Sequence, residues 1–117
     1  HVDLVVSGSV VGTEDGGRVG KGEGFADLEF AVLSELGAVD DATAVATTVH
    51  GMQVVNQEVD LDAHDVPLDL ICTPDRTIRT ADARGGEPPA RPGGVDWDVL
   101  PAEKLESIPV LRRLRPA

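Results

Sequence analysis

The stretch Arg18-Val-Gly-Lys-Gly-Glu-Gly-Phe-Ala-Asp27 has a glycine at every second position and leads directly into an amphipathic segment. Without side chains in the way, such a loop can turn successive backbone N–H groups toward one anion, and a following helix points its positive end at the same place. We therefore expect a phosphate-binding loop. A glycine-rich turn that only redirects the chain between a strand and a helix fits the same spacing, and short glycine motifs do not separate the two interpretations.

The charged residues of this stretch suit a phosphate site. Arg18 and Lys21 supply mobile positive charge beside the glycines. Asp27 falls in the first turn of the expected helix, where a carboxylate can hold a cation that bridges phosphate oxygens. Loop and charges together predict a site for a phosphate with a bound divalent ion.

The elements next to the loop are predicted from the spacing of apolar residues. Residues 2–12 are crowded with Val and Leu, which predicts one strand buried on both faces. After the loop, apolar residues recur at intervals of three and four, which predicts one face of a helix ending at Gly37. The residues of that face are Phe25, Leu28, Val32 and Leu36.

Two further strand candidates follow. Residues 43–49 are rich in β-branched side chains, and residues 68–73 form an apolar run that Pro74 ends. The alternation of strands with connecting segments predicts an α/β unit with a mainly parallel sheet. Cys72, the only cysteine, falls in the second run and excludes an internal disulfide.

The composition changes at residue 81 and divides the chain into three parts. Residues 81–94 hold four glycines and three prolines with few apolar side chains, which predicts an extended, mobile linker. We expect residues 1–80 to form the α/β domain and residues 95–117 to form a tail that docks through Trp97. With 117 residues the chain has at most one domain. Because it opens inside an apparent strand, we expect an incomplete domain whose preceding half lies elsewhere.

The charge balance is strongly acidic. There are 21 acidic against 10 basic residues, a formal net charge of −11, and the only lysines are Lys21 and Lys104. Such a surface repels nucleic acid and anionic membranes, so we expect neither as a partner. An acid-rich, lysine-poor composition is typical of cytoplasmic proteins of salt-loving organisms, although an ordinary acidic protein is the alternative. No run of about 20 apolar residues is present, and we expect a cytoplasmic location.

Two separated motifs resemble the 5-formyltetrahydrofolate cyclo-ligase family, also called methenyltetrahydrofolate synthetases. The first is the stretch from Arg18 to Asp27 with its following helix, and the second is His64-Asp-Val-Pro-Leu-Asp-Leu-Ile-Cys-Thr-Pro74. The resemblance covers about residues 2–80, the C-terminal half of a family member. Where that family usually has two tyrosines, this chain has Phe25 and Ala26. The form of these motifs is most similar to a divergent branch, the methenyltetrahydrofolate synthetase domain-containing proteins and their archaeal relatives.

The resemblance implies a three-layer α/β fold like that of sugar-phosphate isomerases and CoA transferases. It also implies conversion of 5-formyltetrahydrofolate to 5,10-methenyltetrahydrofolate with ATP and magnesium, by attack of the formyl oxygen on the γ-phosphate. On this basis Arg18 and Lys21 are catalytic, and Asp27 and Asp65 are magnesium ligands. The residues implied to line the nucleotide phosphates are Gly20, Lys21, Gly22, Glu23, Gly24 and Phe25.

Two functions therefore remain open. The first is the folate cyclo-ligase, with a folate-type molecule and a nucleotide as ligands and with a missing N-terminal half or a second copy as the protein partner. The second is a non-catalytic module of the same fold that binds a nucleotide or a phosphorylated metabolite. The family contributes basic residues from its N-terminal half, so we expect residues 1–117 alone to show no turnover.

The acidic composition gives a prediction about salt. Because like charges crowd the surface at a net charge of −11, the isolated chain should melt at a higher temperature in molar potassium chloride than in dilute buffer. The measurement is a thermal melt followed by circular dichroism across a salt series. A midpoint that stays flat or falls as salt rises would contradict the halophilic interpretation.

Overall fold

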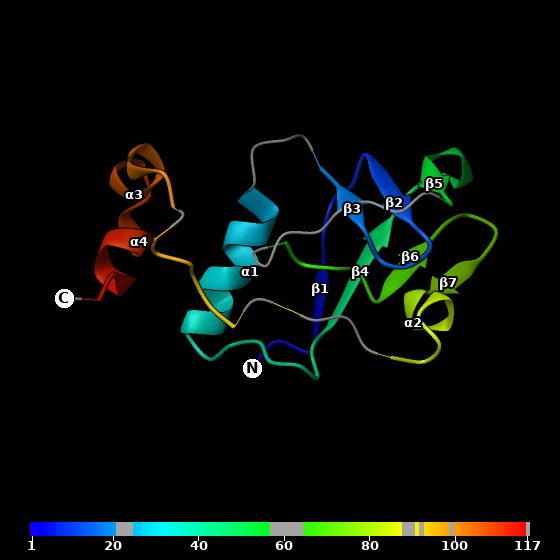
Figure 1. The fold of residues 1–117 in the computed structure, drawn as a ribbon, viewed down its shortest axis with the longest axis horizontal. Coiled ribbons are helices and arrows are strands. Elements are labelled where there is room, and N and C mark those ends of the chain that lie inside the picture. Colours follow the sequence, from blue (N-terminus) through cyan, green and yellow to red (C-terminus); the bar gives the residue numbers. More distant parts are fainter. Residues whose placement is uncertain (21–24, 57–64, 88–90, 92, 99, 117) are drawn as a thin grey trace.

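The computed structural model describes residues 1–20, 25–56, 65–87, 91, 93–98 and 100–116 (Figure 1). Within this part of the chain the strands form two sheets, one of four strands in the order β1-β4-β6-β7 and one of three in the order β3-β2-β5. The strands are β1 (Leu4–Val6), β2 (Val11–Thr13), β3 (Arg18–Val19), β4 (Ala44–Thr48), β5 (Val54–Val55), β6 (Leu70–Cys72) and β7 (Thr77–Arg79). The helices are α1 (Phe25–Glu35), η1 (Gly51–Gln53), α2 (Thr80–Ala83), α3 (Ala102–Ser107) and α4 (Pro109–Leu114).

The four-stranded sheet confirms the α/β fold with a mostly parallel sheet. Strands β1, β4 and β6 run parallel, and only β7 is antiparallel, paired with β6 as a hairpin. The register sets Val5 opposite Val45 and Thr47 opposite Ile71. These side chains share one face of the sheet, and Val45 and Ile71 belong to the main apolar core.

The prediction of one buried strand over residues 2–12 is wrong. The run splits into β1 and β2, which belong to different sheets, because the Ser7-Gly8-Ser9 segment between them has little tendency to stay extended. Nor is β1 buried on both faces, since Leu4 is 52% and Val6 61% exposed. Strand β2 instead packs closely over β6, where a Cβ on Gly12 would lie 3.3 Å from Ile71 Cδ1.

Helix α1 confirms the predicted helix and its end. It stops at Glu35, and Gly37 follows with φ of 71°, the left-handed conformation in which glycine commonly terminates helices. Phe30 and Leu33 pack into the core of the main sheet, whereas Leu28 and Val32 pack into a second apolar cluster formed with the tail. Of the face predicted from spacing, Leu28 and Val32 meet the tail, whereas Leu36 is 57% exposed. The face that meets the sheet was missed.

The tail packs on α1, with Leu111 and Val95 rather than Trp97 as its buried side chains in this contact. Leu111 is fully buried and Val95 is buried beside Ala31 of α1, while Trp97 is only partly buried at the edge of this cluster. Figure 1 shows α3 and α4 on the side of α1 that faces away from the sheets. In the described ranges no helix combines the length and apolarity needed to cross a membrane.

Arg91 lies within the stretch predicted to be a mobile linker, and it contacts the main sheet. Its side chain is 7% exposed and forms an ion pair with Asp69 just before β6. It also donates hydrogen bonds to the carbonyl oxygens of Asp40 and Thr43, and its guanidinium lies 5.9 Å from the ring centre of Phe30. Residues 88–90 and 92 lie outside the described residues. At Arg91 the segment is therefore fixed to the fold, and the division at residues 80 and 94 stays a prediction.

The ion pair gives a prediction about stability. Asp69 Oδ2 accepts hydrogen bonds from both Arg91 and the backbone N–H of Val45, which lies 2.7 Å away. Asp69→Ala leaves a buried guanidinium without its carboxylate, and we expect the free energy of unfolding to fall by about 2–4 kcal/mol. Urea unfolding measures this change.

The control is Asp41→Ala, which removes an exposed carboxylate and should change stability by less than about 0.5 kcal/mol. If the two variants unfold at the same urea concentration, the ion pair between Arg91 and Asp69 does not contribute to stability.

Candidate functional site

In the sequence the glycine stretch falls between β3 and α1, and β3 takes in its first two residues, Arg18 and Val19, whereas the strand predicted before the loop was residues 2–12. Strand β3 pairs antiparallel with β2 and ends at Val19. Lys21, Gly22, Glu23 and Gly24 lie outside the described residues, and Phe25 is described only as the first residue of α1. Their assignment to a nucleotide therefore stays a prediction. The geometry of the site is described from the residues that border the loop on either side, Arg18 before it and Asp27 after it.

Arg18 is held in a fixed position at the first border. Its side chain is 8% exposed, and Nη1 donates a 2.7 Å hydrogen bond to the carbonyl oxygen of Gly8. Gly20 makes room for it, because a Cβ at that residue would lie 2.7 Å from the same nitrogen. The sequence predicted a mobile charge here. The structure shows instead a guanidinium held in place by the carbonyl oxygen of Gly8 and by Asp27.

Asp27 connects three segments at the second border. It lies in the first turn of α1, and its Oδ1 is 3.6 Å from Arg18 Nη2. The same oxygen accepts a 3.0 Å hydrogen bond from the backbone N–H of Val66. Two distant parts of the sequence thus meet at one carboxylate, and Asp65, adjacent to Val66, is brought to the same place.

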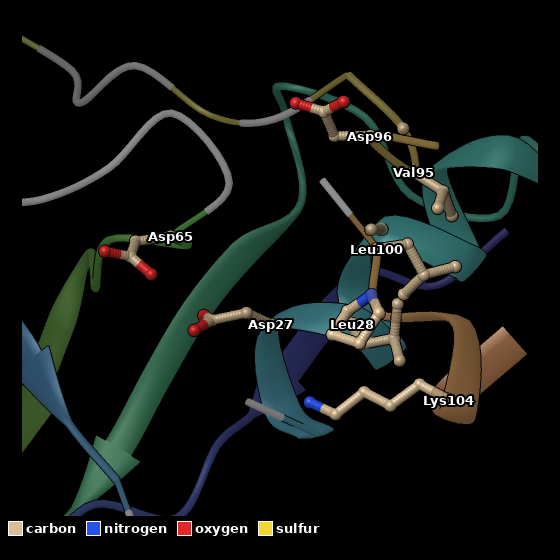
Figure 2. A pocket seen from close by; sticks show the side chains of 10 residues that line it. Asp27, Leu28, Asp65, Val95, Asp96, Leu100 and Lys104 are labelled. Carbon is tan, nitrogen blue, oxygen red and sulfur yellow. The ribbon is translucent and has the colours of Figure 1, made fainter. Parts of the chain in front are cut away.

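A cavity of about 290 Å³ opens beside Asp27 and Asp65 (Figure 2). One wall is α1, through Leu28 and Ala31. The other wall comes from the tail, which sequence reasoning did not assign to any site. The lining residues on this wall are Gly94, the last residue of the predicted linker, and Val95, Asp96, Leu100, Pro101 and Lys104 of the tail.

The two aspartates are a suitable donor set for magnesium carried by a phosphate. Across the described ranges no group of three or more His, Cys, Asp and Glu side chains could hold a metal ion by itself. Magnesium, however, is usually held by one or two carboxylates together with the phosphates of its substrate. Asp27 and Asp65 line one cavity and are of the type that such a pair requires, while Asp27 Oδ1 itself contacts Arg18 and the backbone N–H of Val66.

A second hollow lies where strands β4 and β6 end. It includes Thr48, His50 and Cys72 among its lining residues. His50 caps the short helix η1, since its Nδ1 accepts a hydrogen bond from the backbone N–H of Met52. That hydrogen bond gives His50 a structural role. The cavity beside Asp27 is therefore the stronger candidate.

The Asp27 contacts give a prediction about stability. Asp27→Ala removes the acceptor of the Val66 N–H and the ionic partner of a buried guanidinium, so we expect the free energy of unfolding to fall by about 2–3 kcal/mol. Glu29→Ala changes an exposed residue of the same helix and should stay within about 0.5 kcal/mol of the unmodified chain. Chemical unfolding of both variants measures the difference. An Asp27→Ala protein as stable as Glu29→Ala would show that this carboxylate does not join the segments.

Comparisons with known proteins identify relatives of the chain. Residues 1–74 match the model of the 5-formyltetrahydrofolate cyclo-ligase family. The chain is 49% identical over 115 residues to a mouse "Methenyltetrahydrofolate synthase domain-containing protein", a match that covers 97% of this chain and 30% of the relative. The human and zebrafish proteins of the same name are 47% and 44% identical, each matched over 29% of its length.

The chain thus spans about 30% of the length of these curated relatives, and both motifs on which the resemblance rested fall within the matched residues. The family model covers more than half of the chain, including β3, the glycine loop, α1 and β6. The chain belongs to the 5-formyltetrahydrofolate cyclo-ligase family.

Proposed function

We propose that this chain supplies the nucleotide-phosphate side of an ATP- and magnesium-dependent folate cyclo-ligase site. The single observation that carries the proposal is the meeting of Arg18, Asp27 and the segment at Asp65 and Val66 at the start of α1. This group borders both ends of a glycine loop and combines positive charge with carboxylates. Phosphoryl transfer from ATP depends mainly on such positioning and charge neutralisation.

The proposed reaction converts 5-formyltetrahydrofolate to 5,10-methenyltetrahydrofolate. The formyl oxygen attacks the γ-phosphate, ADP leaves, and the neighbouring folate nitrogen then closes the ring as inorganic phosphate departs. The backbone of the loop from Gly20 to Gly24 cradles the phosphates, with Lys21 and the oriented Arg18 beside them. Asp27 and Asp65 hold the magnesium ion, which neutralises phosphate charge.

A non-catalytic nucleotide-binding module of the same fold is the second candidate. Phe25 and Ala26 stand where the family resemblance places two tyrosines, so two hydroxyl groups are missing beside the loop. Losing oriented hydrogen-bond donors at a transition state typically costs about a hundredfold or more in rate for each donor. This candidate keeps the phosphate site and omits turnover.

The experiment that tests the proposal is titration calorimetry with ATP and magnesium. Gly22→Val places a branched side chain in the loop where the phosphates are proposed to lie, and we expect the affinity to fall at least tenfold. Gly51→Val is the matched control, since a Cβ at Gly51 would meet no atom within 4 Å, and it should leave the affinity within twofold. Equal affinities for the two variants, with the fold intact, would contradict the phosphate site.

A turnover assay tests whether residues 1–117 act as an enzyme on their own. Formation of methenyltetrahydrofolate is followed by its absorbance with 5-formyltetrahydrofolate, ATP and magnesium, and with Asp27→Asn as the control. Turnover by residues 1–117 that Asp27→Asn abolishes would favour the enzyme and contradict our expectation that these residues do not act alone. Nucleotide binding without turnover is the expected result.

A further inference from the structure

The cavity beside Asp27 has one wall that the family match does not include. The match ends at residue 74, whereas the lining residues Val95, Leu100 and Lys104 come from the tail. The relatives matched over 115 residues contain this segment too. The tail therefore adds a surface to a site whose other parts belong to the family core.

The tail wall is firmly held. Leu111 is fully buried and Val95 nearly so, both packed with Ala31 of α1. The backbone N–H of Val95 also donates a 3.0 Å hydrogen bond to Glu35 Oε1 at the last residue of α1. A wall fixed to the helix in this way can present side chains to a ligand at low entropic cost.

The cavity is chemically divided. Leu28, Val95 and Leu100 form an apolar group, and the carboxylates of Asp27 and Asp65 lie apart from it (Figure 2). Asp96 is exposed and adds a carboxylate to the lining from the tail. Such a combination of apolar walls and a few polar groups is typical of sites that bind small organic molecules.

The volume limits what the cavity can hold. About 290 Å³ is at the lower end of the range of about 300–1,000 Å³ found for small-molecule pockets. A whole nucleotide or folate exceeds this space. One planar ring system fits it, with the rest of the ligand outside.

We propose that this cavity receives the nitrogen heterocycle of the substrate, with Leu100 and Asp96 of the tail as residues that determine specificity. The inference rests on the proposed function, because the charged part of the same ligand would then lie toward Arg18 and Asp27. Leu28 and Leu100 pack on the ring, and the Asp96 carboxylate accepts a hydrogen bond from an exocyclic amino group. An adenine ring and a pterin ring both have this chemistry.

The test measures the affinities of three probes by calorimetry in the presence of magnesium. ATP carries the adenine ring, 5-formyltetrahydrofolate carries the pterin ring, and inorganic tripolyphosphate carries neither. Leu100→Phe narrows the cavity, and Leu105→Phe is its control because Leu105 packs on the same apolar cluster without being a lining residue. We expect Leu100→Phe to weaken the binding of one ring-bearing probe at least tenfold and to leave tripolyphosphate within twofold.

A second pair of variants keeps the test independent of packing. Asp96→Asn and Asp98→Asn change neighbouring exposed carboxylates, and only Asp96 lines the cavity. We expect Asp96→Asn to weaken the same ring-bearing probe at least threefold and Asp98→Asn to leave all probes unchanged. Loss of ATP affinity identifies adenine as the ring, and loss of 5-formyltetrahydrofolate affinity identifies the pterin.

The other outcomes contradict either the binding of the ring in this cavity or the proposed function itself. If Asp96→Asn leaves the affinities of both ring-bearing probes unchanged, or if each control has the same effect as its variant, the cavity does not bind the ring. If tripolyphosphate still binds in that case, the phosphate site of the proposed function stands and only the ring site is overturned. Failure of all three probes to bind the unmodified chain overturns the proposed function and this inference together.

Discussion

Burial of α1 on two sides is the constraint on which the rest of the structure depends. Phe30 and Leu33 pack toward the main sheet, and Ala31, Leu28 and Val32 pack toward the tail. A surface helix usually buries one stripe and leaves the opposite stripe in water. Full burial of a large apolar side chain contributes about 1.5–3 kcal/mol, and Leu111 of the tail is fully buried in this contact, so covering the second stripe stabilises the chain. The tail thereby covers the side of α1 that faces away from the sheets (Figure 1).

Polar contacts at the two ends of α1 also join the helix to the sheet side and to the tail side. At its start, Asp27 accepts a hydrogen bond from Val66, ahead of β6. At its last residue, Glu35 accepts one from Val95 in the tail. The helix is thus fixed to the sheet side at one end and to the tail side at the other. A cavity between α1 and the tail, beside Asp27, is a direct consequence of this placement.

The sequence allowed the elements with strong local signals to be predicted. The helix from Phe25 to Glu35, its end before Gly37, and strands β4 and β6 all have clear spacing or β-branched residues. Strand β7 was missed because its three residues, Thr77–Arg79, carry too little pattern, and its pairing with β6 depends on the intervening hairpin. The prediction of one strand over residues 2–12 was wrong because it counted every apolar side chain, although Ser7-Gly8-Ser9 breaks the run.

The site could be predicted only in part, for physical reasons. Arg18 and Asp27 share one motif and the structure pairs them with each other, but their assignment to phosphate and magnesium stays a prediction. The contact between Asp27 and Val66 spans 39 residues and involves a backbone N–H, which carries no signal in the sequence. The tail residues that line the cavity were missed for a similar reason. Their apolar pattern predicts docking, but docking alone does not identify the surface that they meet.

The contacts of Arg91 show that the boundary of the family match is not the boundary of the fold. The match ends at residue 74, yet Arg91 pairs with Asp69 and lies over Phe30, a residue of the core of the main sheet. Composition indicated a linker here because glycine and proline dominate the segment. A single arginine changes the composition of such a segment very little. A buried guanidinium needs a carboxylate or carbonyl oxygens, and Arg91 finds both around the start of β4. This contact holds the chain to the sheet just before the tail reaches α1, so the tail that lines the cavity is joined to the core through a fixed residue.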